Sequence, residues 1–198
     1  MICKLSPSAP RLILFAGHAG TGKSTLAKKG LPLIIEKTGE DFFFLDKDTV
    51  YGAYSAHVME LTTQNPNDRD SPYYLENLRD WEYQGLLDIA RENLLLGVNV
   101  ILVGPFSKEI QSGRMFDQTA LGIPPQTSIS IAWIDLDEEE AKRRMQKRAD
   151  PRDDWKLAHW EQYVPRRVNP PIHPTITRFD NAQFDEAQFD QLIDALTR

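Results

Sequence analysis

The chain has 198 residues, a formal net charge of −6 at pH 7 and a single cysteine. This length suffices for one sizeable hydrophobic core, so we expect a single domain over residues 1–198. The acidic balance argues against a surface that coats nucleic acid in general, although it leaves room for a local basic groove. The lone Cys3 can form neither an internal disulfide nor a metal cluster, which favours a reducing compartment.

The N-terminal residues give no indication of export or of a membrane anchor. Residues 1–7 lack the apolar core of a secretory leader. Nowhere does the sequence hold about eighteen uninterrupted apolar residues, the length that a membrane span needs. We therefore expect no membrane association, a cytoplasmic location, and an N-terminal tail over residues 1–10.

Short apolar runs bounded by turn residues alternate along the chain with segments of helical periodicity. The apolar runs predict strands buried on both faces, over residues 11–16, 42–45, 98–103, 129–134 and 175–179. The periodic segments predict helices over residues 24–36, 50–61, 73–96, 138–148 and 186–196. Strands that alternate with helices indicate an α/β fold with a five-stranded parallel sheet and right-handed crossovers.

A glycine-rich motif follows the first expected strand. Residues 17–24 match the pattern G-x-x-x-x-G-K-[ST] at every fixed position, and a helical segment follows them. Glycines let the backbone turn its N–H groups toward phosphate oxygens, and the positive end of the helix dipole points at the same anion. The lysine of this motif reaches the β- and γ-phosphates, and the hydroxyl binds Mg²⁺. We expect a nucleoside triphosphate to contact Gly17, His18, Ala19, Gly20, Thr21, Gly22, Lys23, Ser24 and Thr25, with Lys23 on phosphate and Ser24 on the metal.

Two carboxylates follow the second expected strand. Asp46 and Asp48 come directly after residues 42–45, and in open parallel sheets ligands bind beyond the carboxyl ends of the strands. Such an aspartate can accept the proton of an attacking hydroxyl or order the Mg²⁺ shell. Both are candidate catalytic residues, Asp46 is also a candidate metal ligand, and the sequence does not decide which one is the base. The alternative is structural: Asp48 would cap the following helix and Asp46 would pair with Lys47.

The expected helix over residues 138–148 carries its acids first and its bases last, as the helix dipole favours. Arg144 and Arg148 are four residues apart and share one face, and Arg152 follows just beyond the helix. Three guanidinium groups on one side suit a lid, expected over residues 138–163, that closes over a triphosphate and stabilises the transferring group. The alternative is a solvated basic face paired with the acids of the first turn.

A long segment, residues 49–97, separates the second and third expected strands. We expect this insertion to be helical and to cover the acceptor of the phosphoryl group. His57, Arg69, Asp70 and Arg79 are therefore candidate substrate-binding residues. The alternative roles for these four residues are surface ion pairs and helix capping.

The third expected strand ends without a pair of carboxylates. It runs into Gly104, Pro105 and Phe106, so no Asp–Glu pair is available there to hold magnesium and polarise a hydrolytic water. The sequence therefore disfavours a motor-type ATPase.

The order of the glycine-rich loop, the strand-end aspartates and the arginine series resembles that of the small P-loop kinases often described as AAA family ATP-binding proteins. That group is similar to polynucleotide kinase, zeta toxin and chloramphenicol phosphotransferase, and the likeness extends over nearly the whole chain. It implies a P-loop NTPase-type three-layer fold with a helical, arginine-bearing lid and ATP as the nucleotide. It also implies Lys23 and Ser24 on phosphate and Mg²⁺, and Asp46 or Asp48 as the base.

Three functions are compatible with this pattern. The first is an ATP- and Mg²⁺-dependent kinase that phosphorylates a hydroxyl of a small molecule. The second is a polynucleotide 5′-hydroxyl kinase, which needs a basic groove beside the aspartates; the chain departs from that group by placing Tyr51 where an arginine is usual. The third is a nucleotide-dependent regulatory switch with slow hydrolysis. Such a switch does not need arginines from its own chain, because these residues speed phosphoryl transfer. The sequence names neither the acceptor nor the oligomeric state.

Overall fold

Five parallel strands form one sheet in the order β2-β3-β1-β4-β5. The computed structural model describes residues 9–198, so Cys3 and most of the tail expected over residues 1–10 lie outside the described residues. In the central register Leu14 of β1 lies opposite Leu102 of β3 and Ile131 of β4. The strands are β1 (Arg11–Ala16), β2 (Phe42–Asp46), β3 (Asn99–Val103), β4 (Ser128–Asp135) and β5 (Ile176–Asp180).

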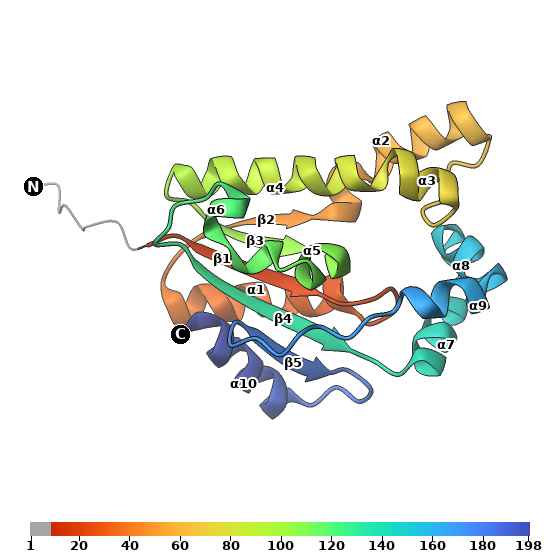
Figure 1. The fold of residues 1–198 in the computed structure, drawn as a ribbon. Helices are drawn as coiled ribbons and strands as arrows, with labels where there is room; N and C mark the ends of the chain where they lie inside the picture. The colour runs from red at the N-terminus through yellow and green to blue at the C-terminus, as the bar shows by residue number, and fades with distance from the viewer. Residues whose placement is uncertain (1–8) are drawn as a thin grey trace, which may run out of the picture.

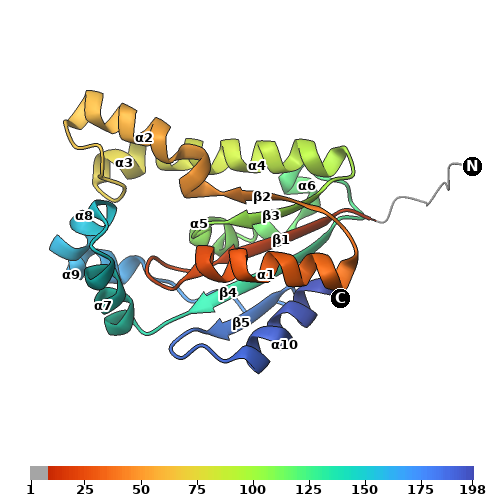
Figure 2. The same ribbon diagram turned by 180° about the vertical axis from the view of Figure 1, so that it is seen from behind.

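Helices cover both faces of this sheet and complete three layers (Figures 1 and 2). Side chains alternate along a strand, so Leu12 and Leu14 pack on one face with α4, whereas Ile13 and Phe15 pack on the other with α1 and α10. The main helices are α1 (Lys23–Thr38), α2 (Lys47–Thr63), α3 (Pro72–Asn77), α4 (Arg79–Leu95), α7 (Glu138–Arg148) and α10 (Glu186–Thr197). Shorter ones are α5 (Ser107–Gln111), α6 (Gln118–Leu121), α8 (Asp154–Ala158) and α9 (Trp160–Tyr163), with 3₁₀ turns η1 (Arg114–Phe116), η2 (Pro151–Asp153) and η3 (Val164–Arg166).

The expected α/β fold and its parallel sheet are confirmed, with one correction about burial. β1, β3 and β4 are buried almost throughout, as the apolar runs predict. β2 and β5 are edge strands, and Phe43 in β2 is 44% exposed, so the prediction of burial on both faces is wrong for these two. An apolar run in the sequence indicates a strand. It does not indicate whether that strand lies in the centre of the sheet or at its edge.

The single helix expected over residues 73–96 is wrong, because the structure divides it into α3 and α4 at Leu78. Leu78 leaves helical geometry, with φ −120° and ψ −41°, and its side chain is buried against Met59 and Tyr74. Helical periodicity gives no sign of the break, since apolar residues that become buried occur on both sides of it, Tyr74 in α3 and Leu86 in α4. Tertiary contacts with α2 therefore decide the position of this break.

The carboxyl ends of all five strands lie at one edge of the sheet, at the right of Figure 1. The tips of α2 and α3 and the helices α7, α8 and α9 gather at this edge, so residues 49–97 and 138–163 face each other there. We refer to residues 49–97 as the insertion and to residues 138–163 as the lid segment. In the described part of the chain, no helix combines the length and the apolar character that a bilayer crossing requires.

The central strand predicts a contrast between two identical substitutions. Leu14 is fully buried and Leu61 is 72% exposed. Leu14→Ala is expected to lower the free energy of unfolding by about 2–5 kcal/mol, because it removes buried apolar contacts and leaves a cavity. Leu61→Ala should change it by less than about 0.5 kcal/mol. Urea unfolding followed by circular dichroism measures both, and equal effects would contradict the assignment of the core.

Candidate active site

The carboxyl edge of the sheet holds a cavity of 680 Å³. Its lining comes from segments far apart in the chain: residues 18–20 and 22–25, residues 46–48, the insertion, residues 103–105, α5, the lid segment, and Arg166 with Val168. The volume lies in the range typical of ligand sites in proteins. The fold therefore brings most of the residues singled out in the sequence to one place.

The phosphate loop, residues 17–24, needs glycine at two positions where the backbone approaches other backbone closely. Gly17 has φ +136°, and a Cβ there would lie 2.5 Å from the Ile134 carbonyl oxygen. Gly20 has φ +79°, and its Cβ would lie 2.8 Å from the Ala141 carbonyl oxygen. Any side chain would push the loop away from β4 and α7. Gly17 itself does not line the cavity. Its role is to let the loop pack closely against β4.

Lys23 occupies the centre of this loop. Its Nζ donates a hydrogen bond to the carbonyl oxygen of His18, at 2.7 Å. Desolvation lowers the pKa of Lys23 to about 8, although the charges of Asp48 and Asp46 act in the opposite direction. The ammonium group thus lies in a site that would favour its charged form more strongly once an anion arrived.

The remaining loop side chains hold the loop in place. His18 Nε2 lies 2.8 Å from the carbonyl oxygen of Val168, and burial lowers the pKa of the imidazole to about 4. Thr21 is fully buried outside the cavity lining, and its carbonyl oxygen accepts a hydrogen bond from Asn181. Ala19 donates its N–H to the Tyr163 hydroxyl at 3.2 Å, which links the loop to the lid segment. Ala19, Gly20, Gly22, Lys23, Ser24 and Thr25 line the cavity together with His18.

Asp46 and Asp48 both line the cavity but differ in their surroundings. Asp46 is buried and caps α2 by accepting the N–H of Asp48 at 2.9 Å. The alternative in which Asp48 caps this helix is therefore wrong, because the helix begins two residues earlier than that alternative requires. The Asp48 side chain is 57% exposed and lies 3.5 Å from Arg152. Desolvation would raise its pKa, but Lys47, Arg152 and Lys23 hold the pKa below its usual value.

Lys47, between the two aspartates, belongs to a buried polar cluster that sequence reasoning missed. Its Nζ contacts Glu82 at 2.9 Å and Asp48 at 3.3 Å. Glu82 also accepts hydrogen bonds from Ser55 and from the Tyr74 hydroxyl, the latter at 2.5 Å. Burial opposes the charge on Lys47, but the surrounding groups, Asp48 and Glu82 among them, hold its pKa above the usual value. The Lys47–Glu82 pair thus joins the end of β2 to α4 behind Asp48.

The structure brings two of the three candidate lid arginines to the cavity. Arg148 is paired with Asp153, and Arg152 is paired with Asp150 at 2.7 Å. Arg144 turns away from the cavity: it contacts Glu140 at 2.8 Å and donates to the carbonyl oxygen of Asn181. The three guanidinium groups therefore do not line one side of the cavity, because the loop after β5 supplies acceptors for the first one.

Three of the four candidates in the insertion line the cavity. Arg69, Asp70 and Arg79 do so, whereas His57 is exposed on α2 outside the lining. Arg79 makes a two-pronged pair with Glu109 of α5, at 2.7 and 3.0 Å. Its placement combines the expected ion pair with a position on the cavity wall.

The insertion and the lid segment are joined across the cavity. Asp70 lies 2.6 Å from Lys156 of α8, and Arg166 donates to the Asp70 carbonyl oxygen at 3.0 Å. The Arg166 guanidinium also lies over the ring of Trp155, 4.8 Å from its centroid. Sequence reasoning singled out neither Lys156 nor Arg166, since nothing in their local pattern distinguishes them from solvated cations.

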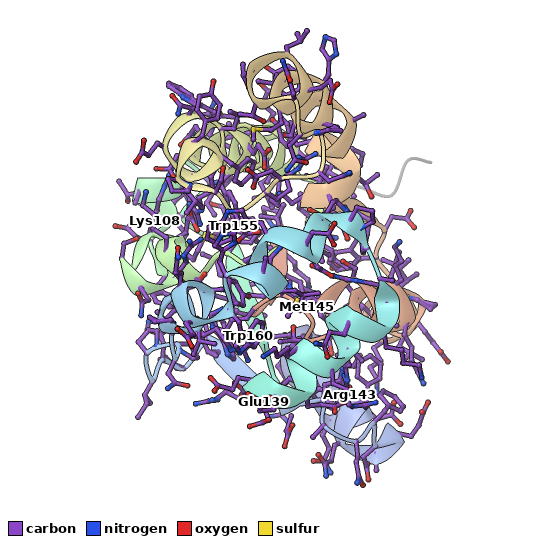
Figure 3. The ribbon with its side chains drawn as sticks, turned by 90° about the vertical axis from the view of Figure 1, so that its right-hand side faces the viewer. Lys108, Glu139, Arg143, Met145, Trp155 and Trp160 are labelled. Atoms are coloured by element: carbon purple, nitrogen blue, oxygen red, sulfur yellow. The ribbon has the colours of Figure 1, made fainter. Side chains whose placement is uncertain are left out.

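Aromatic side chains pack against one another inside the lid segment. Trp155 stacks on His159 and Trp160 packs beside Tyr163. Figure 3 views the lid segment from outside, with Trp155 labelled toward the insertion and Arg143 at the opposite edge. Arg143 is 64% exposed and pairs with Glu140, so it belongs to the solvated face.

The residues present fit a magnesium ion that is held mainly by phosphate. Within residues 9–198 no group of three or more His, Cys, Asp or Glu side chains could enclose a metal. Ser24 and Asp46 both line the cavity beside Lys23, and Mg²⁺ in such sites takes one or two protein oxygens, substrate phosphates and water. The donor set therefore suits a metal that arrives with a nucleotide.

Comparisons with known proteins agree with this geometry. Residues 12–170 match the AAA_33 family, described as an AAA domain. No curated protein matches the chain.

Three solved structures share the fold. The APS kinase CysC of Mycobacterium tuberculosis, in complex with AMPPNP and APS, is 18% identical, with a TM-score of 0.62 over 97% of this chain and 100% of that one. Kti12 of Chaetomium thermophilum with ADP-AlF3 is 18% identical, with a TM-score of 0.60 over 93% and 96%. A sugar kinase of Janibacter sp. is 19% identical, with a TM-score of 0.55 over 94% and 91%. The family match, the parallel sheet and the phosphate loop together identify the chain as a member of the AAA_33 AAA-domain family with a P-loop kinase-like fold.

Proposed function

We propose that the chain is an ATP- and Mg²⁺-dependent phosphotransferase that moves the γ-phosphoryl group to a hydroxyl of a small molecule. The observation that carries this proposal is the meeting of Lys23, Asp48 and Arg152 in one cavity. A phosphate-binding lysine, an ionised carboxylate and a guanidinium are the groups that phosphoryl transfer uses. The structural relatives include proteins named as an APS kinase and a sugar kinase, which supports the same reaction class.

Asp48 suits the general base better than Asp46. The carboxylate of Asp48 is more than half exposed to the cavity, whereas Asp46 is buried and uses one oxygen to cap α2. In the proposed step the acceptor hydroxyl oxygen forms a bond to the γ-phosphorus while the bond from that phosphorus to the bridging oxygen of ADP breaks. The hydroxyl proton passes to Asp48.

Cationic side chains would compensate the charge of the transferring group. Lys23 and Arg152 flank Asp48 closely enough to lower its pKa, so a phosphoryl group beside Asp48 would lie near both cations. Arg148 lines the same wall. Ser24 and Asp46 would hold Mg²⁺, which would neutralise part of the charge of the phosphate groups.

The proposal is tested by release of ADP from ATP and Mg²⁺ with and without pooled acceptors. The pools hold hydroxylated metabolites, nucleosides, aminoglycosides and 5′-hydroxyl oligonucleotides, and Lys23→Ala is the blank. Stimulation by a small-molecule pool is the expected result. Stimulation by oligonucleotides alone would favour a polynucleotide kinase, and tight ATP binding without any transfer would favour a regulatory switch.

The two aspartates predict different kinetic effects. Asp48→Asn should lower kcat by about 10²–10⁴-fold with the dependence on Mg²⁺ concentration unchanged, because it removes the base only. Asp46→Asn keeps an oxygen that can cap α2, so the fold should persist while half-saturation moves to higher Mg²⁺ concentration. Steady-state rates over a magnesium titration measure both. Full activity in Asp48→Asn would show that the base is misassigned.

The position of Lys23 predicts how nucleotide affinity changes with pH. Its pKa is about 8 in the free protein, and phosphate charges should raise it in the complex. Below pH 8 the lysine is protonated in both states, so affinity is flat. Above pH 8 binding must take up a proton, and affinity should fall by up to about tenfold per pH unit.

Calorimetric titration with AMPPNP and Mg²⁺ checks this in two buffers that differ in ionisation enthalpy. The difference in apparent heat gives the number of protons taken up, which should be near zero at pH 6.5 and rise toward one above pH 8. Binding that takes up no proton at pH 8.5 would contradict the assigned role of the lysine.

A further inference from the structure

Cations outnumber carboxylates in the cavity lining, but most of them have a carboxylate partner in or behind the wall. Arg79 is paired with Glu109, Lys108 with Asp80, and Lys47 with Glu82. Arg148 and Arg152 are paired with acids of the lid segment. These ion pairs stabilise the cavity wall. Because a carboxylate neutralises each of these cations, they offer little net positive charge to a ligand.

Arg69 differs from these cations because main-chain carbonyl oxygens, and not a carboxylate, accept its hydrogen bonds. Its Nη1 donates to the carbonyl oxygens of Pro66 and Asp68, at 2.9 and 2.8 Å, and its Nη2 donates to that of Gly52 at 3.0 Å. All three acceptors are neutral main-chain groups. Among residues 9–198 no carboxylate lies within ion-pair distance of this guanidinium, which lines the cavity.

The hydrogen bonds of Arg69 also leave part of its fork free. A guanidinium has five N–H donors, and three of them are used here, so the Nε–H and one Nη2–H have no acceptor in the described part of the protein. Elsewhere in this molecule Nε and Nη2 together bind one carboxylate: Arg143 holds Glu140 and Arg178 holds Asp135 in this way, at 2.7–2.8 Å. Arg69 therefore lines the cavity with two donors unused, on the same two nitrogen atoms that hold carboxylates at these other sites.

The neighbours of Arg69 add to the positive charge on this side. Lys156 and Arg166 both pair with Asp70, at 2.6 and 3.9 Å, and Lys156 also lies 3.6 Å from Asp153. Arg69, Lys156 and Arg166 all line the cavity, and Asp70, next to Arg69 in the chain, is the acid that pairs with the other two where the insertion meets the lid segment. Main-chain acceptors hold the Arg69 side chain in position before any ligand arrives, so little side-chain entropy remains to be lost on binding.

We propose that Arg69 and Arg166 form an anion subsite in the acceptor half of the cavity, so that the acceptor is a small hydroxylated molecule carrying a phosphate, sulfate or carboxylate group. This inference rests on the proposed phosphotransferase function. The anionic group binds at the meeting of the insertion and the lid segment, and the hydroxyl of the same molecule points toward Asp48. The volume of 680 Å³ has to hold the end of the triphosphate as well, which favours a compact acceptor.

The first test uses inorganic sulfate as the probe, with the nucleotide site saturated by AMPPNP and Mg²⁺. Calorimetry on the full chain should find a sulfate site with a Kd on the order of 1 mM. Arg69→Gln and Arg166→Gln should each weaken it by about tenfold or more, because each removes a charge-assisted contact. Arg91→Gln is the matched control: Arg91 lies on α4 outside the lining and pairs with Asp88 on the surface.

Each outcome of this titration has a distinct meaning. If AMPPNP does not bind, the proposed function fails, and the subsite falls with it. If AMPPNP binds and sulfate does not, or if sulfate binds equally to wild type and both variants, only the anion subsite is overturned. Thermal unfolding confirms that each variant is folded, and Arg166→Gln still tests the subsite if Arg69→Gln loses its main-chain contacts and unfolds.

A kinetic test distinguishes acceptor binding from a structural role. In the ADP-release assay, the stimulating small molecule should carry an anionic group. Arg69→Gln should raise the KM for it by about tenfold while kcat changes little, and Arg69→Lys should recover part of the loss. A neutral acceptor whose kcat/KM is the same in wild type and Arg69→Gln would overturn the proposal.

Discussion

Burial of both faces of the parallel sheet is the constraint on which the rest of this structure depends. Helix α4 covers one face, and α1 and α10 cover the other, so apolar side chains fill most of the buried positions of the central strands. Polar groups are thereby confined to the ends of the strands. Because all strands run in one direction, the loops at their carboxyl ends meet at one edge. The phosphate loop and Asp48 become neighbours for this reason, although they are far apart along the chain.

Electrostatic pairing behind the cavity wall determines which groups face a ligand. The Lys47–Glu82 and Arg79–Glu109 pairs are largely buried, and breaking either one would leave an unpaired charge away from water. These pairs are therefore best understood as fixed parts of the wall. Lys23 and Arg69 are different, since each bonds to main-chain carbonyl oxygens and has no close carboxylate partner among the described residues. In the proposed reaction Lys23 contacts the phosphates of the nucleotide, and Arg69 contacts the anionic group of the acceptor.

The insertion and the lid segment depend on each other through the Asp70–Lys156 contact. Neither segment could form the cavity alone, because each supplies one wall. Tyr51 makes a close contact within the insertion: its hydroxyl packs so tightly on Gly85 of α4 that a Cβ there would lie 1.9 Å away. The position where related nucleic-acid kinases tend to carry an arginine is thus used here for packing between α2 and α4, outside the cavity lining.

The sequence by itself determined the strands, most of the helices and the phosphate loop, because each depends on local features: apolar runs, helical periodicity and glycine spacing. It also placed Asp46 and Asp48 at the site, since both follow a strand directly. Only the tertiary structure decided that Asp46 is buried while the Asp48 side chain is 57% exposed, and that Arg144 turns to the loop after β5. The break at Leu78 and the free donors of Arg69 were likewise beyond sequence reasoning. The physical reason is that these properties depend on which distant acceptor or apolar surface lies within contact distance, and local patterns carry no information about that.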